Sequence, residues 1–462
     1  MFDIRARGST IGREVLGGVT TFMAMSYILF VQPAMLSMTG MDSGGVFMAT
    51  CLSSAIACVV MGLWANYPVA LAPGMGENTF FVFTVCGVGA TTAAFRVGWQ
   101  EGLALIIVAG VVFLLLATVG FRSYLLNAIP DSLKSGIAAG IGLFIAMIGL
   151  QWGNVLRHDP ATFLSLAELR GNPVALLTLA GLAITFLLAA LHLRGAILLG
   201  ILITTGLTWA AGRLWHIPTI QWHGLAAVPT GLGKTAGQFI GGFGDLGSRL
   251  SGGHWVDVLI MGFILLFMAI FDTVGTLIGV AGRAGLIHDG KLPKAEQALA
   301  SDAVGTVVGG VLGTSTVTCY IESITGVAAG ARTGLAAIVT GVCLVAAMLF
   351  QPLAEMVAAG VPVNVGGGQT VAKYPMIAPA LIFVGGLMMR ALRDIDWDDL
   401  TEALPGFLTL VTIPFAFSIS HGIAIGFVSY AFGKIVTGRA RQCPWIVYIF
   451  AALFVLRYAL AP

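Results

Sequence analysis

Three carboxylates lie within long apolar stretches of the chain, and these side chains are the first candidates for chemistry. They are Glu77, Asp272 and Glu322, and Asp272 stands between FILLFMAIF and TVGTLIGVAG. A charge at the centre of a bilayer costs roughly 2.5–3.5 kcal/mol even on the most lenient insertion scale, so such residues face the protein interior or a wet cavity. We expect the three acids to accept hydrogen bonds from a small polar ligand.

The same acids are candidates for carrying a proton. No lysine, arginine or histidine lies at comparable depth in the apolar stretches, and a carboxyl group buried without a cation is easier to protonate. We place Asp272 first because its surroundings are the most continuously apolar, with Glu322 and Glu77 as competing carriers. The alternative is structural: each acid is satisfied by the N-terminus of a half-helix and contacts no ligand.

Two interrupted segments carry two of these acids. The segment 68–86 contains Pro68, Pro73 and Gly74, so it cannot form one continuous helix. The segment 313–330 begins with the β-branched, hydroxyl-rich run TSTVT and then becomes compatible with a helix. Irregular backbone is tolerated at membrane depth only where protein buries it or where it lines a cavity. We therefore expect both segments to surround a binding cavity.

Aligning the two segments brings Glu77 and Asn78 opposite Glu322 and Ser323. Paired interrupted segments at matching positions in two halves of a chain are the best sequence indication of a transporter binding site. Asn78 offers both a donor and an acceptor to a planar ligand, and its alternative role is a helix cap. Tyr27 interrupts the first apolar span and lines the cavity in this interpretation; a hydrogen bond between helices explains it equally well.

The composition restricts the class of protein. The 462 residues are 58% hydrophobic and 10% charged, with a mean hydropathy of +0.95, whereas soluble domains are about 25% charged. The chain is therefore predicted to be a polytopic membrane protein embedded in the lipid bilayer. A net charge of +2 does not favour nucleic acid as a partner, and six cysteines without a CxxC pair predict neither a metal site nor a cofactor.

Apolar stretches of span length or shorter predict the topology. Seven precede a loop at 212–254 and eight follow it, and an odd number in the first half is typical of an inverted repeat. With the N-terminus in the cytoplasm, most of the 23 lysines and arginines fall on the inner side. We therefore expect a multi-pass protein of the inner (plasma) membrane. The candidate spans are 16–38, 45–64, 68–86, 99–119, 132–153, 173–192, 195–211, 255–281, 301–312, 313–330, 335–351, 375–392, 404–418, 421–437 and 444–460.

Several of these stretches resemble a known family. The runs TTFMAMSYILFVQPAMLS and WANYPVALAPGMGENTFFVFTV resemble the opening of the AzgA-like purine permeases, a branch of the nucleobase/ascorbate transporter superfamily. The runs IFDTVGTLIGVAG and TVTCYIESITGVAAGARTGL are similar to the eighth and tenth spans of that family. The resemblance extends from about Arg13 to the C-terminus.

The resemblance implies an all-α polytopic fold of fourteen transmembrane segments in two inverted repeats of seven, with short β-strands in the broken spans 3 and 10. It also implies a core domain and a gate domain, and we expect a homodimer formed through the gate domain. The boundaries are 1–211 for the first repeat, 212–254 for an extracytoplasmic loop, 255–462 for the second repeat, 13–120 with 255–351 for the core domain, and 130–211 with 375–460 for the gate domain.

The function implied by the resemblance is import of purine nucleobases (hypoxanthine, adenine or guanine) by proton symport with alternating access. Its binding residues correspond to Asn78, Asp272 and Glu322, and Ser323 and Tyr27 complete the predicted site. Glu77 departs from the family pattern, which has an apolar residue at this position. The alternatives are transport of another nucleobase such as xanthine or uracil, or a channel, which would need polar groups along an open path. The chain has no HExxH or GxSxG motif, so we do not expect an enzyme.

Overall fold

The computed structural model describes eight stretches of the chain, which include all six predicted site residues. Part of the predicted loop at 212–254 lies outside the described residues. The described ranges are 2–88, 96–118, 130–159, 163–215, 224–286, 292–358, 360–364 and 370–460.

The first half of the chain runs from α1 to α9. Its elements are α1 (Ile11–Met25), α2 (Ile28–Ser37), α3 (Ser43–Val60), the π-helical η1 (Met61–Ala65), β1 (Leu71–Pro73), α4 (Met75–Thr79), the π-helical η2 (Phe80–Val85), α5 (Trp99–Thr118), α7 (Asp131–Trp152), β2 (Leu156–Asp159), β3 (Phe163–Leu166), α8 (Pro173–Ala190) and α9 (Ala196–Trp215). A connecting region contains η3 (Leu232–Lys234) and α10 (Phe239–Ser251).

The second half repeats the order of the first, with a strand again preceding a short helix. Its elements are α11 (Trp255–Ala284), α12 (Ala295–Leu312), β4 (Val317–Cys319), α13 (Ser323–Ala328), α14 (Gly334–Ala347), η4 (Met348–Phe350), α15 (Gln351–Ala358), β5 (Val361–Asn364), β6 (Thr370–Lys373), α16 (Ala378–Met388), η5 (Met389–Asp394), α17 (Leu400–Phe415), α18 (Ile419–Val436), η6 (Ala440–Gln442) and α19 (Trp445–Leu460).

Many of these helices have the length and composition of membrane spans. Among the described residues, eight helical segments meet both criteria, and three shorter apolar helices accompany them. The eight are Ile11–Ser37, Ser43–Ala65, Trp99–Thr118, Asp131–Trp152, Pro173–Ala190, Trp255–Ala284, Gly334–Ala358 and Ile419–Val436. The three are Ala196–Gly212, Leu400–Phe415 and Trp445–Leu456. The expectation of a polytopic helical membrane protein is confirmed.

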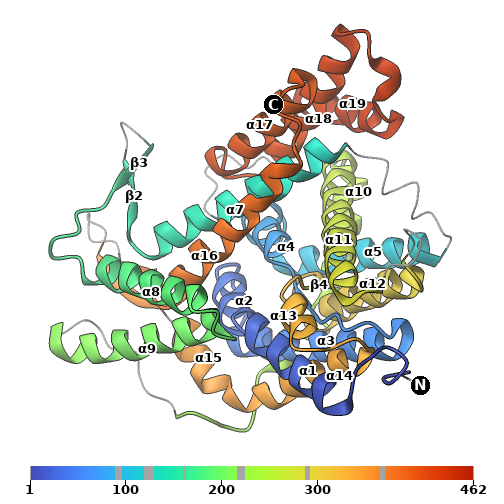
Figure 1. The fold of residues 1–462 in the computed structure, drawn as a ribbon. Helices are drawn as coiled ribbons and strands as arrows, with labels where there is room; N and C mark the ends of the chain where they lie inside the picture. The colour runs from blue at the N-terminus through green and yellow to red at the C-terminus, as the bar shows by residue number, and fades with distance from the viewer. Residues whose placement is uncertain are drawn as a thin grey trace.

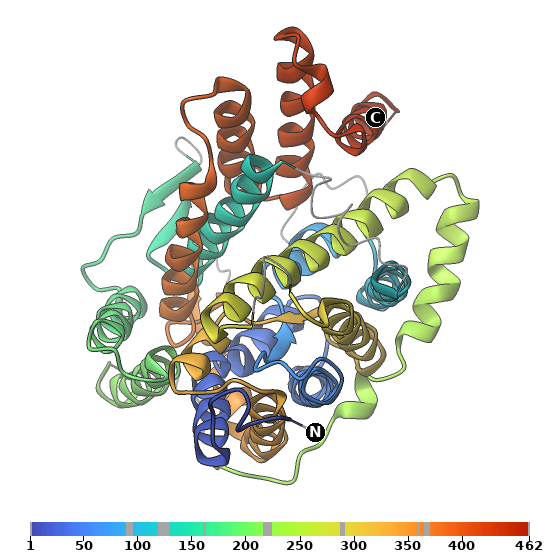
Figure 2. The ribbon, with the colours of Figure 1, turned by 45° about the vertical axis from the view of Figure 1, so that its right-hand side comes forward.

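The helices pack in two groups (Figures 1 and 2). In the first, α1 and α3 pack on α14, α12 packs on α5 and α3, and β1, β4, α4 and α13 lie among them. In the second, α7 packs on α16 and α17, α8 on α9 and α16, and α18 on α17 and α19. Contacts between the groups include those of α4 with α7, α18 with η2 and α1 with α9.

Small residues permit close approach of helices within each group. A Cβ placed on Gly17 of α1 would lie 2.6 Å from the Cβ of Ala331, so only glycine fits there. A Cβ on Gly142 of α7 would lie 2.9 Å from the carbonyl oxygen of Gly385 on α16. Membrane helices associate through such small-residue contacts because lipid supplies no hydrophobic driving force between them.

The structure corrects one span boundary that matters for the site. The sequence placed the start of a span at 301, but α12 begins at Ala295, because the polar run AEQALAS continues the helix. Asp302 is therefore well inside a helix rather than at its end. The first span also differs, because Ser26 and Tyr27 separate α1 from α2.

Candidate functional site

The two broken segments meet through their strands. β1 and β4 pair antiparallel, with Leu71 opposite Cys319 and Pro73 opposite Val317, as expected for short strands in the broken spans. The pairing continues on both sides, since Tyr320 N–H donates to the Ala70 carbonyl at 2.9 Å. Each strand therefore satisfies backbone groups that would otherwise be unpaired at membrane depth. Because the strands are antiparallel, α4 and α13 leave the crossing in opposite directions.

Glu322 lies at the start of α13 and is held by the first span. The hydroxyl of Tyr27 donates to Oε1 of Glu322 at 2.9 Å, and Tyr27 is only 2% exposed. The Tyr27 ring lies 6.4 Å from the ring of Tyr320, whose hydroxyl donates to the Pro73 carbonyl at 2.5 Å. The break between α1 and α2 thus brings Tyr27 to the strand crossing.

Asn78 and Glu77 lie on α4, on the other side of the crossing. Ser315 donates its hydroxyl to Oδ1 of Asn78. Nδ2 of Asn78 and Oε1 of Glu77 are both buried without a hydrogen-bond partner among the described residues. Buried polar groups are normally paired, so a free amide donor and a free carboxylate oxygen on adjacent residues indicate a place where a ligand or water supplies the partners.

Asp272 occupies the middle of α11 and is exposed, together with Gly275 one turn further along the helix. Phe271, immediately before it, is partly buried and lies 4.5 Å from the ring of Phe267. An exposed carboxylate in the middle of a span-length helix has to face water or a polar ligand. Of the site candidates, Asp272 is the one with the most open side chain.

Ser323 has a structural contact. Its hydroxyl oxygen accepts a hydrogen bond of 3.0 Å from the Ala70 amide, and the residue is completely buried. Ser323 therefore ties the end of β4 to the start of β1. Thr79, the residue after Asn78, is also buried and donates back to the Met75 carbonyl within its own helix.

Asp302 is a further acid near the site, fully buried, that the sequence interpretation missed. Thr273, next to Asp272, donates to Oδ2 of Asp302 at 2.7 Å, and Thr273 also shares a hydrogen bond of 2.9 Å with Thr318 of β4. Oδ1 of Asp302 is buried without a partner among the described residues. Gly305 on the same helix face packs against Val317. Gly305 and Gly309 follow Asp302 by three and seven residues and so lie on the same face of the helix. This pattern of small residues could have indicated from sequence that the face bearing Asp302 is closely packed.

The four acids lie close enough together to influence one another electrostatically. Glu77 interacts electrostatically with Asp272 and Asp302, and Asp272 interacts with Glu322. No lysine or arginine of the described ranges forms an ion pair with any of them. The ammonium of Lys134 on α7 lies 5.4 Å from the Phe271 ring centroid, so one basic side chain does approach the residue preceding Asp272.

Comparison with known proteins identifies the family. A family model described as "Permease family" matches residues 12–425. The chain is 39% identical over 466 residues to the guanine/hypoxanthine permease PbuG of Bacillus subtilis, covering 99% of this chain and 98% of the relative. It is 40% identical over 460 residues to the adenine permease AdeP of Escherichia coli, covering 99% of this chain and 95% of the relative.

Solved structures agree on the fold. The transmembrane domain of the cyanobacterial bicarbonate transporter BicA is similar with a TM-score of 0.59 at 14% identity, covering 90% of this chain and 97% of that domain. SLC26A9 is similar with a TM-score of 0.60 at 13% identity, covering 92% of this chain and 65% of that chain. The fold is that of two inverted seven-span repeats, as the resemblance implied. By the family model over residues 12–425 and the two permease relatives, the chain belongs to the permease family of the nucleobase/ascorbate transporters.

Proposed function

We propose that the protein imports purine nucleobases by proton symport. The observation that carries the proposal is the pair of free groups on adjacent residues, Nδ2 of Asn78 and Oε1 of Glu77, in a site that also contains Asp272 and Glu322. A purine edge offers N–H donors beside carbonyl or ring-nitrogen acceptors. The carboxylates suit the N–H groups, and the Asn78 amide suits an acceptor. The relatives named for guanine, hypoxanthine and adenine support the choice of purine.

In this proposal, one of the carboxylates binds the transported proton. The acids have no ion-pair partner among the described lysines and arginines, so each proton that binds removes one negative charge from the group. Asp272 is the first choice because its side chain is exposed in the middle of a span-length helix, where a proton can reach it. Glu77 is the main competitor, since it is buried at 1% exposure with a free oxygen.

Alternating access is the movement we propose. In this proposal the first packing group, with the strand crossing, acts as the core domain, and the second, built on α7, α16 and α17, acts as the gate domain; the helix packing supports this division. Rocking of the gate against the core would expose the site to each side of the membrane in turn. We further propose a multi-pass protein of the inner membrane with a cytoplasmic N-terminus, which forms a homodimer through its gate domain.

The test is transport in reconstituted liposomes. Labelled hypoxanthine, adenine and guanine are offered to liposomes with an imposed inward proton gradient, and each is competed with unlabelled purines, xanthine and uracil. We expect saturable accumulation that collapses when a protonophore is added. Uptake that rises linearly with concentration would indicate a channel. Competition by xanthine or uracil alone would show that the substrate is a nucleobase other than these purines.

A further inference from the structure

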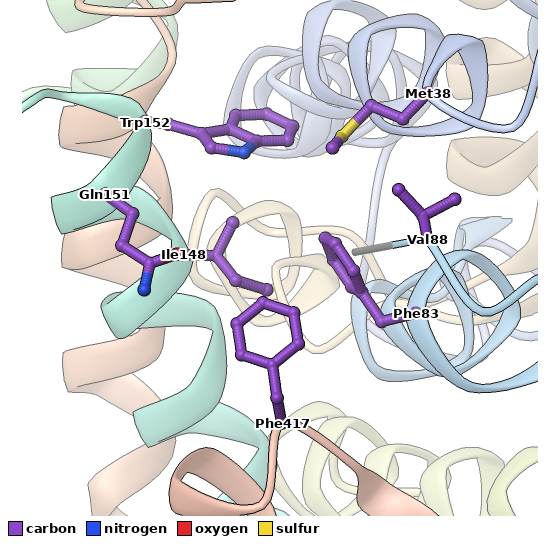
Figure 3. Close-up of a pocket in the computed structure, with 7 residues that line it drawn as sticks. All are labelled: Met38, Phe83, Val88, Ile148, Gln151, Trp152 and Phe417. Atoms are coloured by element: carbon purple, nitrogen blue, oxygen red, sulfur yellow. The ribbon is translucent and has the colours of Figure 1, made fainter. Parts of the chain in front are cut away.

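A cavity lies between the two packing groups, and none of the four acids lines it. It has a volume of about 320 Å³, at the lower end of the roughly 300–1,000 Å³ range of ligand pockets. Figure 3 shows its side chains around a common space, with Trp152 and Met38 on one side and Phe417 and Phe83 on the other. Met38, Trp152 and Phe417 lie at or just after the C-terminal ends of α2, α7 and α17. We call this cavity the aromatic vestibule.

Three phenylalanines separate the aromatic vestibule from the carboxylate site. Phe83 of η2 lies 5.8 Å from Phe144 of α7 and 5.1 Å from Phe417, and Phe144 lies 4.8 Å from Phe417, all in edge-to-face geometry. Phe83 belongs to the first packing group, and the other two belong to the second. The cluster therefore fills the boundary between the two packing groups with aromatic contacts.

The order of these features follows α7. Ile141 faces Gly76, one residue before Glu77, because a Cβ on Gly76 would lie 3.3 Å from the Ile141 side chain. Phe144 is about 4.5 Å further along the helix axis, and Ile148 is about 10.5 Å further than Ile141, at 1.5 Å per residue. The carboxylate level, the phenylalanine cluster and the vestibule thus succeed one another along a single helix.

The backbone of Phe417 is strained. Its φ is +50°, a conformation that is uncommon for residues other than glycine and exceptional for a bulky side chain. Residues held in this region cost conformational free energy and cluster at ligand clamps and switches. A turn with this backbone conformation would favour glycine, but the chain has phenylalanine there. The Phe417 ring both lines the vestibule and belongs to the phenylalanine cluster.

The vestibule offers the two features that recognise a planar heterocycle. Trp152 is held at a fixed position, with its ring 4.7 Å from that of Tyr374 and its carbonyl accepting from the Tyr374 amide at 2.8 Å. Gln151 lines the cavity, and its side-chain amide makes no hydrogen bond to any described residue. Aromatic faces bind planar rings by offset or edge contacts, and one amide supplies both a donor and an acceptor.

We propose that the aromatic vestibule is a capture site for a planar, hydrogen-bonding heteroaromatic ring, occupied before the ring passes Phe417 to reach the carboxylates. This inference rests on the proposed function, because it takes the ring to be the transported nucleobase. Capture at the vestibule raises the local concentration of base at the phenylalanine cluster, and the Gln151 amide selects polar heterocycles over plain hydrocarbon rings.

The first experiment compares Gln151→Ala with a matched control, Gln442→Ala, whose exposed glutamine lies in η6 away from the cavity. Purine uptake by proteoliposomes is measured over a range of concentrations. Loss of one hydrogen bond predicts a roughly two- to tenfold higher KM for Gln151→Ala, with the maximal rate preserved and Gln442→Ala unchanged. An unchanged KM in Gln151→Ala would overturn the inference.

The second experiment detects occupancy when the carboxylate site is disabled. Val88→Cys and, separately, Met38→Cys, both at residues that line the cavity, are combined with Glu322→Gln and treated with a membrane-impermeant thiol reagent, with wild-type protein as the blank for native cysteines. We expect purine at millimolar concentration to slow labelling at both positions. Labelling that is indifferent to purine in these double variants, but protected in the single cysteine variants, would show that only the carboxylates bind.

The two proposals fail in different ways. If the wild-type protein does not take up purine at all, the proposed function is wrong. If the wild-type protein accumulates purine while Gln151→Ala keeps its KM and the cysteines in the double variants remain unprotected, the function stands and the capture site does not exist.

Discussion

The hydroxyl of Tyr27 donates a hydrogen bond of 2.9 Å to Oε1 of Glu322, across 295 residues of chain. This bond links the break between α1 and α2 to the acid at the start of α13. It also orients the carboxylate, because it holds Oε1 at a fixed position beside Tyr27. Tyr27 is therefore best described as the residue that positions Glu322.

Glu322→Gln tests the role of this carboxylate in binding. The amide keeps the shape and one acceptor oxygen for Tyr27 but presents N–H donors where the base offers its own N–H. An unpaired buried polar group costs about 1–3 kcal/mol, so we expect a roughly 5- to 150-fold weaker affinity for purine, measured by calorimetry in detergent. Tyr27→Phe, which leaves the acid in place, should lose less. Wild-type affinity in Glu322→Gln would contradict the assignment.

Asp272→Asn tests proton coupling. The amide cannot ionise, so it imitates the protonated acid permanently. We expect the variant to bind purine, to lose accumulation against a gradient, and to show binding that no longer changes between about pH 5 and pH 8. Glu77→Gln is the comparison. If Asp272→Asn liposomes still accumulate purine with an imposed proton gradient and Glu77→Gln liposomes do not, the proton belongs to Glu77.

Thr325→Cys tests whether α13 borders the site. Thr325 is exposed one turn after Glu322 and donates to the Glu322 carbonyl at 2.7 Å. We expect a small thiol reagent to label the cysteine and saturating purine to protect it. Thr437→Cys is the matched control, because Thr437 is exposed and makes the same kind of local bond at the end of α18. Equal protection of both positions would point to a global effect of purine.

Glu14→Ala tests a structural acid. Glu14 is fully buried on α1, and its carboxylate accepts from the Arg332 amide at 2.9 Å and from the Thr333 amide at 3.2 Å, just before α14. Removing it leaves two buried backbone donors unpaired, at about 1–3 kcal/mol each. We expect a lower melting temperature in detergent. Glu296→Ala, an exposed acid in the first turn of α12, should melt like the wild type.

Asp42 gives a prediction for how the stability of the folded protein depends on pH. Burial raises the pKa of Asp42, but the hydrogen bonds from Lys234 and from the Gly45 amide outweigh it and hold this pKa below its ordinary value. Such a group stabilises the folded protein above its unfolded pKa, about 3.9, and the contribution is lost as the pH falls through the folded pKa. Asp42→Asn should therefore melt lower than wild type at pH 7, and the difference should begin to shrink only as the pH falls below about 4 and be lost as the pH passes through the lower folded pKa.

The salt bridge supplies a control for this pH effect. Lys234 lies 2.9 Å from Asp42 and is exposed, so its attraction is screened by salt. We expect Lys234→Met to reproduce part of the Asp42→Asn difference in low salt and little of it in high salt. A difference that persists unchanged at pH 3.5 would exclude the carboxylate as its origin.

The sequence by itself determined the class of protein and the broken segments. Apolar stretches have few alternatives to membrane spans, and Pro68, Pro73 and the run TSTVT cannot continue a helix, so both interruptions could be predicted from local chemistry. The family resemblance implied short strands in both broken segments, and the structure adds that these strands, β1 and β4, pair with each other. Glu77, Asn78, Asp272 and Glu322 were conspicuous because polar groups at membrane depth are rare.

Only the tertiary structure decided which polar groups are already satisfied. Ser323 was predicted beside the ligand, and the structure shows that its hydroxyl oxygen already accepts from the Ala70 amide. Asp302 was overlooked, and it accepts a hydrogen bond from Thr273. Hydrogen-bond partners hundreds of residues apart, such as Tyr27 and Glu322, leave no local pattern. The aromatic vestibule likewise exists only where the ends of three distant helices meet. The residue type determines which hydrogen bonds a side chain can make, and the tertiary packing determines which partners it contacts.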